Sequence, residues 1–63
     1  MNKAKYTITL PTGIKYDAKK VFDTHFIHSP SGKKVSKAIG VTDMDNNTRY
    51  YHPEEIYHIR ERN

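Results

Sequence analysis

The chain contains no cysteine and only three glycines and three prolines among its 63 residues. Without cysteine it can form no disulfide bond and can hold no metal ion through thiolates. This composition fits a reducing compartment, where disulfides are rare. The first expectation is therefore a domain held together by noncovalent packing alone.

Long apolar runs are also missing. No stretch approaches the roughly 20 apolar residues that a membrane-spanning helix requires. The basic residues 1–5 are not followed by the apolar segment of a signal peptide. We therefore expect a cytoplasmic protein with no membrane partner.

The chain is too short for more than one small domain. A chain of about 60 residues buries only about 60% of the surface that it exposes when unfolded, so its stability is marginal. We expect a single domain over residues 1–63 with an ordered core over roughly residues 5–60. A homodimer would bury additional apolar surface, and the sequence permits one.

Acidic residues are scarce in the first 37 residues. This segment has only Asp17 and Asp23, and it contains all eight lysines of the chain. The last 26 residues carry five acids and three arginines, and the net charge of the whole chain is +4. Because charge bears on partners rather than on fold, this asymmetry predicts an acidic partner, either nucleic acid or an acidic protein surface.

Two β-hairpins are indicated by alternation and turn residues. Residues 5–10 alternate polar and apolar, and the Pro-Thr-Gly turn at 11–13 precedes a return strand, which predicts a hairpin over residues 5–16. A second hairpin is expected over residues 35–52, with its turn at residues 43–47, which are rich in Asp and Asn.

The remaining segments are less regular. Residues 24–28 are rich in β-prone side chains and predict a separate strand, and residues 29–32 form a loop. Residues 17–23 have two interpretations, a short helical turn capped by Asp17 or an irregular connection. The C-terminal segment also has two interpretations. One is a helix that starts at Pro53, and the other is a 3₁₀ turn at residues 53–55 followed by a short strand at residues 56–60.

These elements predict a mostly β fold, of the β or α+β class. Their order is that of a small, strongly bent antiparallel sheet or five-stranded barrel of Src-homology-3 or Sm-like architecture, with a short C-terminal helix under one interpretation. An oligonucleotide-binding-like barrel is usually longer than this chain. This agreement is one of architecture, and it transfers no functional residue.

The lysines are the first candidate binding residues. If the barrel brings the exit of the first hairpin and the loop at 29–32 to one rim, a set of positive charges converges there and can bind a phosphate backbone with steep salt dependence. The predicted contacts are Lys15, Lys19, Lys20, Lys33, Lys34 and Lys37. The competing interpretation is that the lysines are scattered and serve only solubility.

Arg49 and Tyr50 are the second candidates. Consecutive residues on a strand face opposite sides, so at most one of Tyr50 and Tyr51 fills the core. An exposed Tyr50 beside Arg49 can stack on a base or anchor a protein partner. Alternatively it covers an edge of the barrel.

Neither a metal site nor a catalytic site is expected. His25 and His28 are three residues apart, which on a strand places them on opposite faces, and the chain offers no thiolate ligand. It has neither a phosphate-binding glycine loop nor a nucleophile elbow, and it can hardly enclose a pocket. The sequence therefore predicts no cofactor, no metal and no enzymatic activity.

The leading hypothesis is thus a non-enzymatic module that contacts nucleic acid through a lysine-rich rim, with Arg49 and Tyr50 as further contacts. The alternative is a protein-protein interaction module or inhibitor, of phage or bacterial origin, that uses the Tyr/Arg-rich C-terminal surface. Small basic proteins of this size are common in phage and bacterial genomes.

Overall fold

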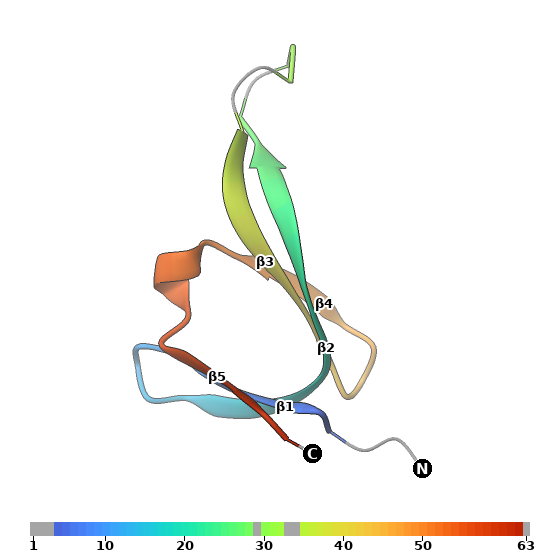
Figure 1. Cartoon of the computed structure of the whole chain (residues 1–63), viewed down its shortest axis with the longest axis vertical. Coiled ribbons are helices and arrows are strands. Elements are labelled where there is room, and N and C mark those ends of the chain that lie inside the picture. The colour runs from blue at the N-terminus through green and yellow to red at the C-terminus, as the bar shows by residue number, and fades with distance from the viewer. Residues whose placement is uncertain (1–3, 29, 33–34, 63) are drawn as a thin grey trace.

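The computed structural model describes residues 4–28, 30–32 and 35–62, and these residues form five strands and one 3₁₀ turn (Figure 1). The elements in chain order are β1 (Tyr6–Thr9), β2 (Lys15–Ile27), β3 (Val35–Asp43), β4 (Thr48–Tyr51), η1 (Pro53–Glu55) and β5 (His58–Glu61). The prediction of a mostly β fold is confirmed. In the described part of the chain, no helix has the length and apolar character needed to cross a bilayer.

All five strands form one antiparallel sheet in the order β4-β3-β2-β1-β5. The sheet is strongly bent, as predicted (Figure 1). Its two edge strands, β4 and β5, do not pair with each other in the described residues. The sheet therefore does not close, and the predicted barrel is not seen.

The first predicted hairpin is confirmed. The backbone N–H of Leu10 donates to the carbonyl of Ile14 at 2.8 Å, and that of Gly13 donates to the carbonyl of Leu10 at 2.9 Å. Gly13 has a backbone φ of +93°, a value that residues other than glycine rarely adopt. The turn at residues 11–13 thus depends on this glycine.

The prediction for residues 17–23 is wrong under both interpretations, because these residues belong to one strand that continues to Ile27. The separate strand expected at residues 24–28 is the second half of β2. The register shifts between Ala18 and Lys20, so that Lys19 is an extra residue, and here β2 exchanges β1 for β3 as its partner. Such a β-bulge bends a strand and interrupts its alternation, which explains why the segment did not have the pattern of a strand.

The second predicted hairpin is also confirmed. β3 pairs with β4 from Thr42 opposite Thr48 to Ile39 opposite Tyr51. In the turn, one carboxylate oxygen of Asp43 accepts hydrogen bonds from the backbone N–H groups two and four residues later, at 2.9 and 3.0 Å. Asn46 adopts the left-handed conformation, with a φ of 69°. The Asp/Asn composition therefore acts as expected, through local hydrogen bonding and tolerance of positive φ.

At the C-terminus the turn-plus-strand interpretation is correct and the helix interpretation is wrong, although the strand runs over His58–Glu61 rather than residues 56–60. The backbone N–H of Glu55 donates to the carbonyl of His52 at 2.9 Å, which closes the single turn η1. In return, the backbone N–H of His52 donates to the Glu55 carboxylate at 2.8 Å. β5 then lies beside β1, with Ile59 opposite Ile8. The pairing with β1 satisfies the backbone of this segment, which a helix would satisfy internally.

The core is small and lies on the inner face of the bent sheet. Ile8, Ala18 and Val41 are fully buried at its centre. Partly buried apolar side chains surround them, namely Tyr6, Leu10, Tyr16, Val21, Ile39, Tyr51, Ile56 and Ile59. Side chains from β1, β5, the first half of β2, β4 and the part of β3 beside β4 all contribute to this core. We call this region the base.

The β2–β3 hairpin extends beyond the base as a two-stranded arm (Figure 1). We define the arm as residues 24–27 of β2 and residues 35–38 of β3, which pair only with each other among the described residues. The longest dimension of the molecule, 41 Å, reflects this extension. The arm is a single layer, unlike the base.

Candidate nucleic-acid interface

Lys15 and Lys37, one from each of the two predicted lysine clusters, lie near opposite ends of β2. Lys15 begins β2 opposite Thr9, whereas Lys37 of β3 is paired with His25 near the far end. Ten residues separate Lys15 from His25, which is roughly 30 Å of strand. The structure therefore does not bring Lys15 and Lys37 to one rim. Lys33 and Lys34 lie outside the described residues.

Lys19 and Lys20 lie in the middle of β2, at and directly after the bulge. The Nζ atom of Lys20 is 5.2 Å from the centroid of the Phe22 ring, within the range of a cation–π contact. Both lysines are thus near the bend rather than at either end of the strand. Lys20 is the only described lysine that contacts an aromatic ring in this way.

Tyr50 and Arg49 project from opposite faces of β4. Tyr50 is paired with Gly40, and its side chain is 55% exposed. Arg49 is paired with Val41, on the face that carries the core. Tyr51 packs against the core, so the prediction that only one of the two tyrosines fills it is confirmed.

Aromatic rings gather on the outer face of β2, β3 and β4. Phe22 and Tyr50 meet edge to face, with ring centroids 6.2 Å apart. Further along the arm, Phe26 lies 4.5 Å from His52, and His52 stacks on His28 at 6.5 Å with ring planes 9° apart. We call these residues the outer aromatic face, which comprises Lys20, Phe22, Phe26, His28, Tyr50 and His52.

Two small residues of β3 make room for these rings. Gly40 lies directly under Phe22, and a Cβ atom at this position would overlap the ring. Ala38 is fully buried although it belongs to the arm. The side chain of Ser36 shares a hydrogen bond of 2.6 Å with Nε2 of His28, which holds that imidazole beside the sheet. The outer aromatic face is therefore packed in place rather than loosely attached.

A groove of about 450 Å³ lies beside the β3–β4 turn, and four of its six lining residues are charged. Its walls are formed by Tyr16, Asp17, Asp43, Met44, Asp45 and Arg49. Burial raises the pKa of the Tyr16 phenol, and the hydrogen bond with the Tyr51 hydroxyl at 2.8 Å adds to this rise. The carboxylates of Asp43 and Asp45 disfavour phosphate here, so the surroundings of Arg49 do not favour its predicted contact with nucleic acid.

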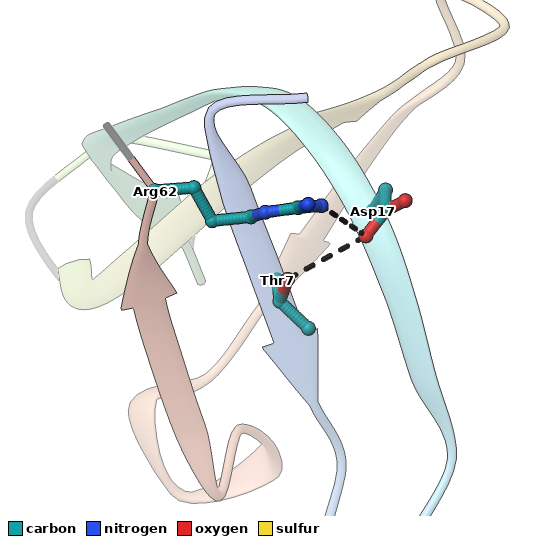
Figure 2. A network of polar contacts seen from close by, with 3 residues as sticks. All are labelled: Thr7, Asp17 and Arg62. Atoms are coloured by element: carbon teal, nitrogen blue, oxygen red, sulfur yellow. Dashed lines mark hydrogen bonds and ion pairs between the residues drawn. The ribbon is translucent and has the colours of Figure 1, made fainter. Parts of the chain in front are cut away.

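The C-terminal end of the chain is fixed to the outer side of the base by polar contacts (Figure 2). Arg62 Nη1 lies 3.3 Å from Asp17 Oδ1, and the same oxygen accepts a hydrogen bond from the Thr7 hydroxyl at 3.5 Å. Both charged side chains are about half exposed, so the ion pair contributes about 0–1 kcal/mol. The pair neutralises Asp17 at this surface.

Sequence reasoning missed four members of the outer aromatic face. Phe22, Phe26 and His28 share one parity, but the bulge before them obscured the strand to which they belong. Recognising that β2 is continuous would have grouped these three. His52 joins them only through the pairing of β3 with β4, and no local pattern indicates this contact.

The histidines form one close pair in the described part of the chain. His28 and His52 are neighbours, yet no group of three or more potential metal ligands occurs in the part of the chain that the structure describes. Comparison of the chain with protein-family models, curated proteins and solved structures finds no match.

Proposed function

We propose that this chain is a small non-enzymatic module that binds nucleic acid, and that the outer aromatic face is the contact surface. The observation that carries the proposal is the exposed Tyr50 ring beside Phe22, with the Lys20 ammonium group close by. Aromatic platforms next to positive charge are the usual means of binding unpaired bases. The element order supports the finer proposal of a Src-homology-3 or Sm-like architecture.

In this proposal the rings and the lysines have separate roles. A base stacks on the exposed Tyr50, while Lys20 and Lys19 attract the adjacent phosphates. Lys15 and Lys37 lie too far apart to contact the same phosphate, so they extend the positive electrostatic potential along β2. Each phosphate neutralised adds to the salt dependence of binding.

A salt titration of binding to random single-stranded and double-stranded DNA and RNA tests the proposal. We expect micromolar affinity for single strands at about 50 mM salt, with a log–log slope that reflects a few phosphate contacts. No binding of any of these nucleic acids at that salt concentration would refute the proposal.

A matched pair of tyrosine variants locates the site. Tyr50→Ala should weaken single-strand binding by about five- to 150-fold, because one stacked base is worth about 1–3 kcal/mol. Tyr57→Ala removes a tyrosine that is 76% exposed but lies between η1 and β5, and it should leave binding unchanged. Equal effects of both changes would show that binding does not use the outer aromatic face.

A second candidate, a protein-protein interaction module, is favoured by a separate surface. A mostly apolar groove of about 370 Å³ lies between the β1–β2 turn and η1, lined by Leu10, Pro11, Thr12, Tyr51, Glu54 and Glu55. Its apolar floor and two carboxylates suit a basic, apolar peptide segment. Partner capture lost on Leu10→Ser but retained on Tyr50→Ala would support this candidate over nucleic acid, provided that Leu10→Ser remains folded by circular dichroism.

A further inference from the structure

One edge of β2 is left open by the bend. β2 pairs with β1 over Lys15 to Ala18 and no further. From residue 21 to residue 27, no described strand lies on that side of β2 (Figure 1). These seven residues contain no proline, and their register with β3 is continuous. An edge of this kind presents unpaired N–H and C=O groups and can pair with another strand, and proteins usually protect it.

The sequence of this edge is complementary to itself. Residues 21–27 read Val-Phe-Asp-Thr-His-Phe-Ile, and the order of residue types is mirrored about Thr24. If two copies pair antiparallel about this residue, each position i lies opposite position 48 − i of the second copy. The apolar ends, the aromatic rings and the Asp/His pair then all meet suitable partners.

We propose that the protein forms a homodimer by antiparallel pairing of its two β2 edges, with a two-fold axis at Thr24. On the inner face, Val21 meets Ile27 of the second copy, and Asp23 meets His25 of the second copy. An imidazole N–H can donate to a carboxylate in either charge state of the ring. Because of the two-fold symmetry, this Asp–His hydrogen bond forms twice in the dimer. On the outer face, Phe22 meets Phe26 of the second copy, which is a favourable cross-strand pair.

The exposure of the arm agrees with this arrangement. Ile27 is 69% exposed in the single chain, and its neighbour on β3, Val35, is also exposed. Lys37 lies next to His25 in the pairing, so it adds positive charge near Asp23 of the second copy. A core centred on three buried residues leaves a small domain short of buried apolar surface, which a dimer would supply.

Dimerisation would also join two outer aromatic faces across the axis, because Phe22 and Phe26 project from the face that carries Tyr50 and His52. The dimer does not depend on the proposed function, since the edge is complementary whatever the rings bind.

Sedimentation equilibrium of the full chain over a range of concentrations tests for the dimer, and a cysteine variant tests its geometry. The two Thr24 Cα atoms would lie about 4.5–5.5 Å apart, within the range that a disulfide bridges. Thr24→Cys introduces the only cysteine of the chain. Under mild oxidation it should form a covalent dimer rapidly. Thr12→Cys, in the exposed β1–β2 turn, controls for random collision and should oxidise slowly.

An exchange of charges tests the register. His25→Asp places two carboxylates opposite each other at two symmetric positions, and should weaken the dimer by about tenfold or more. Asp23→His loses the same pair. The double change Asp23→His with His25→Asp restores it in reverse and should recover the affinity of the original chain. A monomer at all concentrations up to about 1 mM overturns the proposal. So does a dimer that is insensitive to His25→Asp, or one in which Thr24→Cys oxidises no faster than Thr12→Cys.

Discussion

The base and the arm are built from the same two strands, yet they differ in what supports them. In the base, β2 and β3 have a neighbour on their second edge and a core on their inner face. In the arm they have only each other, and the rings of the outer aromatic face cover just one side. A two-stranded ribbon is at best marginally stable by itself. The base therefore supplies the stability, and the arm supplies exposed surface and a free strand edge.

This division assigns roles to different parts of the charge pattern. Lys20, Lys37 and the rings of the outer aromatic face lie in or beside the arm and the bend, as does one acid, Asp23, whereas Asp43 and Asp45 lie at the other end of β3, in and beside the β3–β4 turn. If the proposed function is correct, a phosphate-bearing ligand is expected to bind at the bend rather than at the β3–β4 turn.

The largest expected difference between base and arm is in the free energy of unfolding, when an isoleucine in each region is truncated to alanine. Ile8→Ala removes a side chain that is fully buried in the base, and we expect a loss of about 2–5 kcal/mol in the free energy of unfolding. Ile27→Ala, in the arm, should change it by no more than about 0.5 kcal/mol in the monomer. Urea denaturation at the lowest workable protein concentration measures both. Similar losses would show that the arm is not energetically separate from the base.

The junction of arm and base is tested at Gly40. Gly40→Ala places a methyl group where the Phe22 ring lies, so the ring must move outward, and we expect a cost of about 1–3 kcal/mol. The double variant with Phe22→Leu removes the overlap. It should therefore be destabilised by less than the sum of the two single changes, as measured by a double-mutant cycle in urea. Additive losses would show that the ring and the glycine are not coupled.

A smaller effect is expected at the Tyr16–Tyr51 hydrogen bond in the base. Tyr16→Phe removes this bond and should cost about 1 kcal/mol near neutral pH. Because the pKa of the Tyr16 phenol is raised in the fold, the unfolded chain releases this proton first as the pH rises past about 10. The original chain should therefore lose its advantage over Tyr16→Phe above that pH. Urea midpoints of both proteins at several alkaline pH values measure the difference, and an advantage that grows with pH would contradict the prediction.

The smallest effect is expected for the surface ion pair of Figure 2. Arg62→Ala should cost about 0–1 kcal/mol, and less at high salt, since both partners are half exposed. Arg60→Ala, on the adjacent strand β5, removes the same charge but leaves the Asp17 contact intact. A loss above about 2 kcal/mol for Arg62→Ala alone would mean that the C-terminal contact holds the base together.

The two hairpins could be predicted from the sequence because their determinants are local. Gly13 permits the positive φ of the first turn, and the Asp43 carboxylate accepts backbone hydrogen bonds within the second. The exposure of Tyr50 and the partial burial of Tyr51 follow from strand geometry. The sequence pattern could not show whether the lysines share one rim, because that depends on how far apart Lys15 and Lys37 lie in space.

The course of β2 shows where the pattern failed. The bulge at residues 18–20 breaks the alternation in the middle of a long strand, so the pattern indicates two separate segments where the fold has one strand. A bulge is selected by nonlocal pairing, here the exchange of β1 for β3 as partner, and its local signature is weak.

The sequence by itself determined the β class, the two turns and the self-complementary order of residues 21–27, because these depend on residue types at close spacing. Only the tertiary structure decided that this segment is a free edge, that His52 meets Phe26, and that Lys15 and Lys37 lie apart. These features follow from which strands pair across long stretches of chain. Such pairing is set by the bend and the shared core, and not by any one segment.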